Sequence, residues 1–298
     1  VHSGDSACVW PAQSISPDML AEIEDTTHRL AKALKIRGLL NIQFALKDGN
    51  LYVLEVNPRA SRTVPFVCKA TGIPLIKMAT RLMLGESLAE VRSLLPAEMP
   101  KHVAVKVPVF PFNKFKGTDP KLGPEMKSTG EVMGIDDNFA IAFAKAHIAA
   151  NNKLPLSGSV FISVNDADKA KTLPVAQHLK RLGFELAATE GTAKFLAQAG
   201  LSVKALKKKH EGSPNVEELI RQGEISLIIN TPIGEEALID DSYIRKAALE
   251  SQIPLVTTIG GAAALAEGIE SLQKDKFKVR SLQSYLATVA GDSALSLA

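Results

Sequence analysis

The chain has 298 residues, of which 46% are hydrophobic and 22% are charged, and its formal net charge is +3. This composition is typical of a soluble globular protein, and the length predicts roughly two domains of about 150 residues each. The weak charge, without a long basic run, argues against nucleic acid as a partner. No apolar stretch reaches the roughly 18 residues of a membrane span. The only cysteines are Cys8 and Cys68, too few for a disulfide framework, so we expect a reducing, cytoplasmic location.

The chain opens on Val1-His2-Ser3-Gly4-Asp5, which reads like the interior of a motif, so we expect a piece of a longer protein. A first helix should begin after Ser16, because this capping hydroxyl is followed by Pro17 at the first helical position and Asp18 in the first turn. The helical spacing of apolar residues ends at Gly38.

Two strands, over residues 40–47 and 51–57, are predicted to form a hairpin. A two-residue turn at its tip would set Gln43 opposite Leu54 and mix polar with apolar side chains on both faces. A three-residue loop over Asp48-Gly49-Asn50 instead sets Gln43 opposite Glu55 and leaves one apolar face, so we predict that register. The apolar pairs expected are Ile42 with Val56, Phe44 with Leu54 and Leu46 with Tyr52.

The next segments are predicted from periodicity and composition. Residues 69–90 have a helical pattern. The apolar side of that helix is expected to consist of Ile76, Ala79, Leu82 and Met83. Pro and Gly are frequent over residues 96–134, which predicts an irregular connection. Residues 138–150 return to helix, and residues 151–158 are typical of a linker.

From Ser159 onward, short apolar runs alternate with helical segments, which predicts a parallel sheet covered on both faces. The strands are predicted over residues 160–164, 184–187, 225–229 and 253–257. The helices are predicted over residues 167–182, 192–199, 216–222, 239–249 and 262–272. Pro174 indicates either a kink in the first of these helices or a later start near Thr172, and both remain open.

Three polar side chains, Gln43, Glu55 and Asn57, share one face of the predicted hairpin, and Arg59 and Arg62 follow. One carboxylate with two amide oxygens is a hard, oxygen-only ligand set that suits Mg²⁺ or Mn²⁺ held jointly with substrate phosphates. Two arginines can hold phosphoryl or carboxylate oxygens. The alternative is an ordinary solvated strand face, which spacing alone slightly favours.

The run Leu54-Glu55-Val56-Asn57-Pro58-Arg59 resembles the E-x-N-P-R signature of ATP-grasp ligases. Its extension through Phe66 resembles the second ATP-grasp unit of the carbamoyl phosphate synthetase large-subunit family. Three further segments resemble the same family, at residues 2–6, 37–44 and 123–132. The four segments in this order are highly specific, and the resemblance covers essentially the whole chain.

The resemblance implies ATP and Mg²⁺ or Mn²⁺ as cofactors. Val1, His2 and Ser3 would line the nucleotide, although from the residues alone His2 reads as an ordinary loop histidine. The residues implied to bind the metals that bridge the ATP phosphates are Gln43, Glu55 and Asn57. Arg59 and Arg62 would have the catalytic role of steadying the transferred phosphoryl group and the carbamate. The rest of the nucleotide clamp would lie upstream of Val1.

A second site is suggested where Thr189-Glu190-Gly191-Thr192 opens a helix after a strand. A Gly-containing turn at a helix N-terminus favours phosphate, although plain capping by Thr189 or Thr192 is the favoured interpretation of so short a motif. The turn resembles the methylglyoxal synthase-like domain that ends the same large subunit. That resemblance implies a small phosphorylated effector such as UMP or IMP. The matching effector-binding positions are Lys169, Thr189, Thr192, Lys208 and Asn230.

Some positions depart from the family pattern. Pro232 stands where nucleotide-binding relatives often have Thr, so one hydroxyl donor is missing. Val107 and Val256 stand where ornithine-activated relatives carry acids, although Asp5 is retained. The resemblance therefore implies poor binding of ornithine.

The fold implied is α/β in three parts: the C-terminal lobe of an ATP-grasp domain over residues 1–90, an irregular and helical connection over residues 91–150, and a parallel-sheet methylglyoxal synthase-like domain over residues 151–298. The implied parent activity is the ATP-dependent, glutamine-hydrolysing synthesis of carbamoyl phosphate for pyrimidine and arginine biosynthesis. This piece would contribute to phosphorylation of carbamate and to allosteric control, and alone it should be inactive.

The implied partners are a glutaminase small subunit and the upstream ATP-grasp units of the large subunit. One alternative is a stand-alone methylglyoxal synthase-type lyase, which is disfavoured because Asn230 offers an amide where that enzyme family uses Asp. The other alternative is a module that only senses nucleotides.

Overall fold

The computed structural model describes the chain outside residues 1, 97, 113–121, 232–241, 275–276 and 288–298. The chain divides into two compact units, which are described separately. Unit 1 comprises Val1–Cys8 and Ala104–Lys278, and unit 2 comprises Val9–Val103 and Val279–Ala298. Within the described ranges, every helix is too short or too polar to cross a lipid bilayer.

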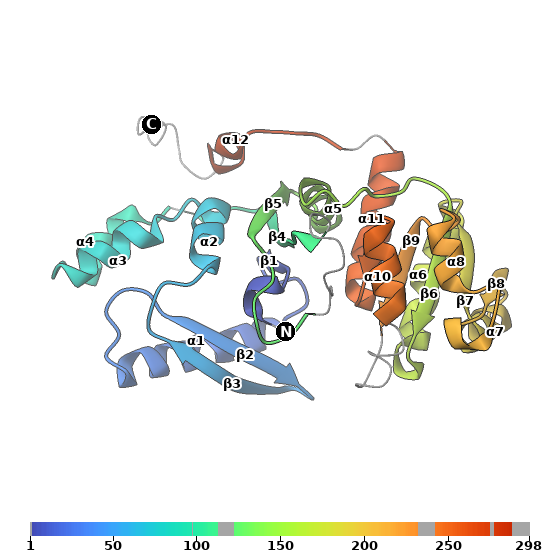
Figure 1. The fold of residues 1–298 in the computed structure, drawn as a ribbon. Helices are drawn as coiled ribbons and strands as arrows, with labels where there is room; N and C mark the ends of the chain where they lie inside the picture. The colour runs from blue at the N-terminus through green and yellow to red at the C-terminus, as the bar shows by residue number, and fades with distance from the viewer. Residues whose placement is uncertain (1, 97, 113–121, 232–241, 275–276, 288–298) are drawn as a thin grey trace. The chain divides into compact units, whose positions relative to one another are not determined.

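Unit 2 contains a helix that begins as predicted and a two-stranded hairpin (Figure 1). Its helices are α1 (Pro17–Ala33), α2 (Thr63–Thr71), α3 (Leu75–Met83), α4 (Leu88–Val91) and α12 (Leu282–Ala287), and its hairpin strands are β2 (Asn41–Lys47) and β3 (Asn50–Asn57). The Ser16 side chain accepts a hydrogen bond from the Met19 amide, and Pro17 is the first helical residue. The predicted N-cap is confirmed. Helix α1 packs on β3.

The hairpin register is confirmed at its open end and wrong at its tip. The confirmed pairs are Asn41 with Asn57, Ile42 with Val56 and Gln43 with Glu55. The register then shifts, so that Phe44 pairs with Val53 and Leu54 is the extra residue of a bulge. The predicted pairs of Phe44 with Leu54 and Leu46 with Tyr52 therefore do not form.

The tip is a two-residue turn rather than the predicted three-residue loop. Asp48 and Gly49 have φ angles of 52° and 77°, the type I′ geometry that matches the twist of the flanking strands. The prediction excluded a two-residue turn because it assumed that side chains alternate without interruption along both strands. The bulge at Leu54 restores the polar pair of Gln43 and Glu55, and it leaves Leu54 63% exposed.

The segment predicted as one helix over residues 69–90 is three helices. Helix α2 ends at Gly72, which has a φ of 73°, and Pro74 precedes α3. Helix α3 buries the stripe of Leu75, Met78, Ala79 and Leu82 against Ile73 and Val91. Ile76 and Met83, which were predicted on the apolar side, are 54% and 61% exposed, because α3 packs through the neighbouring face that carries Leu75 and Met78.

The segment predicted to be irregular, over residues 96–134, contains two strands. A three-stranded sheet has the order β1-β4-β5, with β1 at Cys8–Trp10, β4 at Val103–Val109 and β5 at Gly130–Asp136. The prediction was wrong because it relied on the frequency of Pro and Gly. The valines at alternate positions of β4 favour a strand. Val107-Pro108 is extended, as expected.

Helix α5 (Phe139–Ala149) lies between β5 and α11 (Ile259–Gln273). The predicted helix is confirmed, and the Asn138 side chain caps it by accepting from the Ala140 and Ile141 amides. A Cβ on Gly134 of β5 would overlap backbone atoms of α5. On the other side, a Cβ on Gly268 of α11 would lie 2.7 Å from the Ala144 Cβ. Both contacts therefore require glycine.

The alternating region forms a five-stranded parallel sheet, as predicted, in the order β10-β9-β6-β7-β8. Its strands are β6 (Ser159–Val164), β7 (Glu185–Thr189), β8 (Val203–Leu206), β9 (Leu227–Thr231) and β10 (Leu255–Val256), and its helices besides α11 are α6 (Lys169–Arg181), α7 (Glu190–Gln198), α8 (Val216–Arg221) and α10 (Ser242–Glu250). Strand β8 was not predicted, because only four residues form it. Helix α6 continues through Pro174 from Lys169, which excludes the later start near Thr172.

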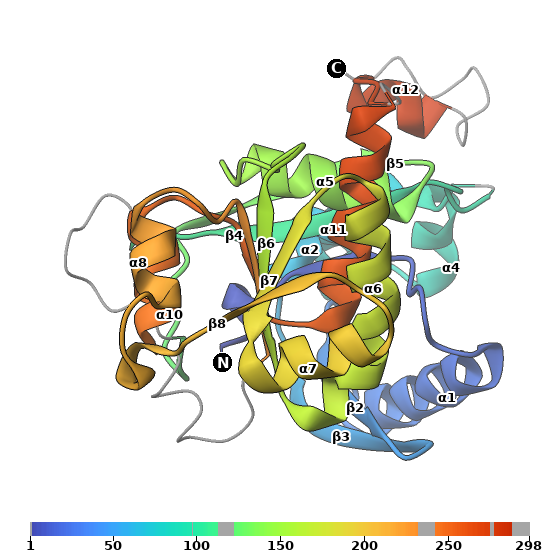
Figure 2. The same ribbon diagram turned by 90° about the vertical axis from the view of Figure 1, so that its right-hand side faces the viewer.

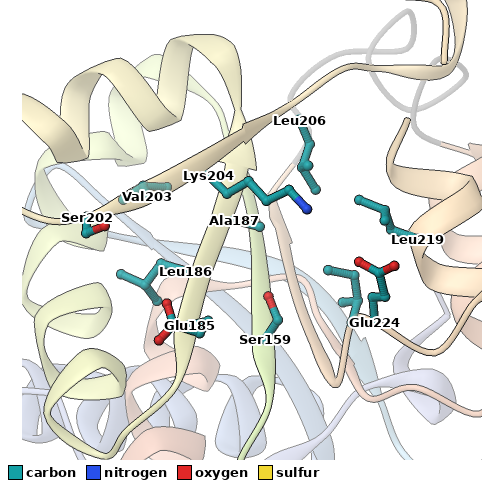
Figure 3. A pocket seen from close by; sticks show the side chains of 11 residues that line it. Ser159, Glu185, Leu186, Ala187, Ser202, Val203, Lys204, Leu206, Leu219 and Glu224 are labelled. Atoms are coloured by element: carbon teal, nitrogen blue, oxygen red, sulfur yellow. The ribbon is translucent and has the colours of Figure 1, made fainter. Parts of the chain in front are cut away.

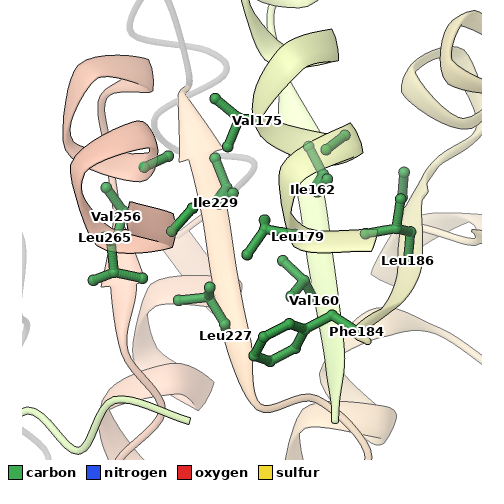
Figure 4. Packing of buried hydrophobic residues seen from close by; sticks show 14 of the residues in the cluster. Val160, Ile162, Val175, Leu179, Phe184, Leu186, Leu227, Ile229, Val256 and Leu265 are labelled. Carbon is green, nitrogen blue, oxygen red and sulfur yellow. The ribbon is translucent and has the colours of Figure 1, made fainter. Parts of the chain in front are cut away.

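Helices cover both faces of this sheet (Figure 2). On one face, Leu179 and Phe184 pack with Leu265 of α11 in a core that also includes residues of α6 and α7 (Figure 4). On the other face, α8 and α10 pack on Phe161 and Ile228. These side chains are fully buried, and complete burial of such residues is worth about 1.5–3 kcal/mol each. The sheet is therefore a rigid platform for loops at its edges.

Candidate functional site

Three polar side chains converge at the open end of the hairpin, as the sequence predicted. The Gln43 Nε2 and the Asn57 Nδ2 each donate a hydrogen bond of 2.7 Å to the same oxygen, Oε1 of Glu55. An ordinary solvated strand face, the alternative interpretation, can carry the same two hydrogen bonds. Glu55 is exposed, so its carboxylate can be reached by a ligand.

This donor set fits a magnesium or manganese ion by its chemistry. In the described residues, no group of three or more His, Cys, Asp or Glu side chains is placed to hold a metal, so a metal would depend on amide oxygens here. Rotation of the Gln43 and Asn57 amides would present two oxygens beside Glu55. Such a set leaves coordination positions for phosphate oxygens, which Mg²⁺ commonly uses.

The two predicted arginines follow the strand on the way into α2. Arg59 donates from Nη1 to the Ala60 carbonyl oxygen at 2.9 Å, and Arg62 is the exposed residue that precedes the first turn of α2. The amide groups of a first helical turn carry partial positive charge. Arg62 therefore adds a full charge at a helix end that already favours an anion.

The loop at the start of the chain belongs to unit 1, and Val1 lies outside the described residues. The His2 amide donates to the Gly123 carbonyl oxygen at 2.8 Å, and the His2 Nδ1 accepts from the Gly4 amide at 2.9 Å. Ser3 is exposed. His2 therefore has a local structural role, and Ser3 is available to a ligand.

Asp5 holds this loop to the segment that precedes β5. Its carboxylate accepts hydrogen bonds from the amides of Lys127 and Ser128, at 2.9 and 2.8 Å, and Asp5 is 5% exposed. Burial alone would raise the pKa of Asp5, but these hydrogen bonds outweigh burial and hold the pKa below its usual value. No local sequence pattern predicted this anchor.

The five predicted effector residues all lie at or beyond the carboxyl ends of neighbouring parallel strands. Asn230 is near the end of β9, Lys169 follows β6, Thr189 ends β7 and Lys208 follows β8. The order β9-β6-β7-β8 separates the outer two by three strand spacings, about 14 Å. That span suits a nucleotide better than a lone phosphate. Ligands of open parallel sheets bind outside this edge.

The turn between β7 and α7 contains two of the predicted effector residues, Thr189 and Thr192. Within the described residues, the Thr189 side chain caps no amide of α7. Instead, the Thr189 hydroxyl donates to the Thr192 hydroxyl at 3.3 Å, and Thr192 is 2% exposed. Lys169 Nζ is paired with Asp166 at 2.6 Å and lies 3.5 Å from the position of a Cβ on Gly191. A cation therefore stands over the first turn of α7.

Sequence reasoning missed Asn165 and Thr231. The Asn165 Nδ2 donates to the Thr231 carbonyl oxygen at 2.9 Å and lies 3.1 Å from the Thr231 hydroxyl. This contact joins β6 to β9, the strands between which the chain order reverses. A polar residue directly after a buried strand was the available signal.

Two of the three residues that depart from the family pattern lie among the described residues. Val107 and Val256 are buried, at 5% and 7% exposed, so neither offers a polar group to solvent. Pro232 lies outside the described residues.

A cavity of about 380 Å³ lies at the opposite edge of the same sheet (Figure 3). Its lining residues are Ser159, Glu185, Leu186, Ala187, Ser202, Val203, Lys204, Leu206, Leu219, Glu224 and Ile225. Ser159, Glu185 and Ser202 lie at or directly before the amino ends of β6, β7 and β8, and the lining includes none of the five predicted effector residues. The cavity is therefore not the predicted effector site, which lies at the carboxyl ends.

Comparisons with known families match both parts of the chain. Residues 1–91 match the model of the carbamoyl-phosphate synthase L chain, ATP binding domain, and residues 171–257 match the model of the MGS-like domain. Among solved structures, a methylglyoxal synthase from Elizabethkingia anophelis NUHP1 has a TM-score of 0.33 at 21% identity and covers 38% of this chain and 79% of its own. So low a TM-score supports no structural argument.

Relatives named carbamoyl phosphate synthase large chain align with nearly the whole chain. The protein from Methanosarcina barkeri is 50% identical over 286 residues, which is 96% of this chain and 72% of that protein. Those from Methanosarcina acetivorans and Acidobacterium capsulatum are 50% and 52% identical, and the chain spans 27% and 26% of their lengths. The chain therefore belongs to the carbamoyl phosphate synthase large-chain family.

Proposed function

We propose that this chain supplies the metal- and phosphoryl-binding part of a site that phosphorylates carbamate with ATP. The proposal is carried by the convergence of Gln43 and Asn57 on the Glu55 carboxylate, directly before Arg59 and Arg62. A bound Mg²⁺ or Mn²⁺ would neutralise charge on the phosphates. The arginines and the first turn of α2 would hold the phosphoryl oxygens and orient them.

The remainder of the site would come from upstream parts of a longer large chain. Leu54, Val53 and Tyr52 of the hairpin are 63%, 44% and 50% exposed, which supports a further covering segment. We infer that the whole enzyme takes nitrogen from glutamine through a glutaminase small subunit and works in the cytoplasm. The purified 298-residue chain should make no carbamoyl phosphate.

The test uses the full-length large chain and the reverse partial reaction, in which carbamoyl phosphate and ADP give ATP. Glu55→Ala should lower kcat by at least about a hundredfold, because developing phosphoryl charge loses its metal. Glu22→Ala on the exposed part of α1 is the control. Wild-type turnover by Glu55→Ala would overturn the proposal, as would turnover by the 298-residue chain that Glu55→Ala abolishes.

We also propose that the parallel-sheet domain binds a small phosphorylated effector such as UMP or IMP at the carboxyl ends of its strands. The uncapped turn after Thr189, with Lys169 over it, supports this site. The phosphate should dominate affinity, because the helix end and lysines favour an anion.

Titration calorimetry on the 298-residue chain tests this site. Thr192→Val should weaken UMP binding by about 1–3 kcal/mol, because one hydrogen bond to a charged group is lost. Lys208→Ala should weaken it more at low salt than at high salt, and ornithine should bind poorly. Equal binding of uridine and UMP would contradict the phosphate hypothesis. Tight ornithine binding would contradict the interpretation of Val107 and Val256.

A further inference from the structure

The C-terminal helix α12 packs against the end of α2 in unit 2 (Figure 1). Tyr285 of α12 is 3% exposed, and its ring meets the His102 ring edge to face, with centroids 5.5 Å apart. A Leu286 methyl carbon lies 3.3 Å from the position of a Cβ on Gly72. Gly72 is the C-cap residue of α2. Helix α12 therefore contacts the place where α2 ends.

His102 connects Tyr285 to the backbone of α2. Its ring nitrogen Nε2 lies 2.7 Å from the carbonyl oxygen of Ala70, in the last turn of α2, and His102 is 3% exposed. Trp10 also meets the His102 ring edge to face, with the two ring centroids 6.0 Å apart. The last-turn carbonyl of α2 is thus held by an imidazole that two aromatic rings fix in place.

The docked state of α12 depends on these contacts. Six residues are far too few for a helix that is stable by itself. Arg280 adds a further contact, because its guanidinium carbon lies 4.0 Å from the centre of the Tyr285 ring. Loss of the buried ring should therefore release the whole of α12 rather than open a small cavity.

A helix as short as α2 moves as one rigid body, so a shift of its C-terminal end also shifts its N-terminal end. The helix has nine residues, a rigid rod of about 13 Å, and Arg62 is its N-cap residue. Its far end is the one that Tyr285, His102 and Leu286 hold. A shift of about 1 Å at a reacting centre can cost about a hundredfold in rate.

We propose that Tyr285 and Leu286 are positioning residues: α12 anchors the C-terminal end of α2 and thereby sets the position of Arg62. This inference rests on the proposed function of Arg62. The anchor acts on Arg62 through α2, because Leu286 contacts Gly72 at the C-terminal end of that helix.

The experiment uses the full-length large chain with Tyr285→Ala, Tyr285→Phe and the control Gln283→Ala, which alters an exposed residue of the same helix. Amide hydrogen exchange over residues 66–72 should be roughly tenfold faster in Tyr285→Ala. In the reverse partial reaction, kcat should fall about tenfold while the KM for ADP stays unchanged. Tyr285→Phe keeps the ring and should restore both values, and Gln283→Ala should match the wild type.

Tyr285→Leu, which keeps an apolar side chain, replaces Tyr285→Ala if the latter fails to fold, and effector binding by calorimetry reports on folding elsewhere. Unchanged exchange over residues 66–72 would overturn the anchor. Faster exchange with wild-type kcat would equally overturn it. If Glu55→Ala is inactive while Tyr285→Ala is fully active, the anchor fails and the proposed function stands; wild-type activity in both variants overturns the proposed function itself.

Discussion

Replacing Gly134 with alanine tests the close contact between β5 and α5. A Cβ at this position would overlap the carbonyl oxygen of Ala142 and the amide nitrogen of Ala146, and it would lie 3.0 Å from the Ala146 Cα. All three atoms are helix backbone, so no side-chain rotation can relieve the overlap. Helix α5 would have to move as a body.

The magnitude follows from two opposing effects. Overpacking of a well-packed interior costs about 1–3 kcal/mol, and an unyielding backbone places Gly134→Ala at or above the upper end. Against this, a Gly→Ala change stabilises the folded state by about 0.4–1 kcal/mol, because it lowers the conformational entropy of the unfolded chain. We expect a net loss of about 2–3 kcal/mol, or a fall in Tm of roughly 4–12 °C for a unit of this size.

The matched control is Gly130→Ala on the same strand. Among the described residues, no atom lies within 4 Å of a Cβ at Gly130, so this variant should equal or slightly exceed the wild type in stability. Urea denaturation followed by circular dichroism compares the two. If the free energies of unfolding of Gly134→Ala and Gly130→Ala differ by less than about 0.5 kcal/mol, this contact does not hold the helix and the reasoning is refuted.

Burial lowers the pKa of His147 from 6.5 to about 4. The neutral ring therefore stabilises the fold at pH values above 6.5, its pKa in the unfolded chain, and this stability is lost as the pH falls toward 4. The urea midpoint should drop between pH 7 and pH 5, and an equal drop in His147→Phe would refute this cause. Lys106 Nζ lies 3.2 Å from Glu131 with its side chain only 4% exposed, so Glu131→Ala should cost about 3 kcal/mol by leaving a buried charge, and Lys106→Met much less. Equal losses in calorimetry would contradict that account. Asp5→Asn should destabilise the chain at pH 7 by about 1–3 kcal/mol. The difference from the wild type should shrink as the pH falls below 3.8, the ordinary pKa of the carboxyl, and vanish once the pH is below the lowered pKa of folded Asp5. A difference that persists in acid would contradict the role of its charge.

Much of the fold could be predicted because burial imposes simple periods. The parallel sheet followed from apolar runs such as Val160–Ile162 between helical segments. The bulge at Leu54 could not be predicted, because strict alternation has no place for an extra residue. Gly72 and Pro74 indicate that the segment over residues 69–90 is divided, but the prediction followed the helical period of its apolar residues.

The candidate sites were predictable where side chains act together on one element. Gln43, Glu55 and Asn57 are brought together by one strand pair, and the register near them was predicted correctly. Anchors between distant segments left no periodic trace. Asp5 with Ser128, and His102 with Tyr285, join residues more than a hundred positions apart, which only tertiary structure reveals.

The glycine contacts on both sides of α5 bear on how regulatory domains can be exchanged between relatives. A chimera joined within residues 151–158 would set a foreign α11 against a resident α5, although Gly268 admits Ala144 with no room for a methyl group. Recombination just ahead of residue 103 would transfer β4, β5, α5 and the parallel sheet as one piece. A junction placed just before Ser159 would therefore separate α5 from α11, whose contact leaves no space for a Cβ on Gly268.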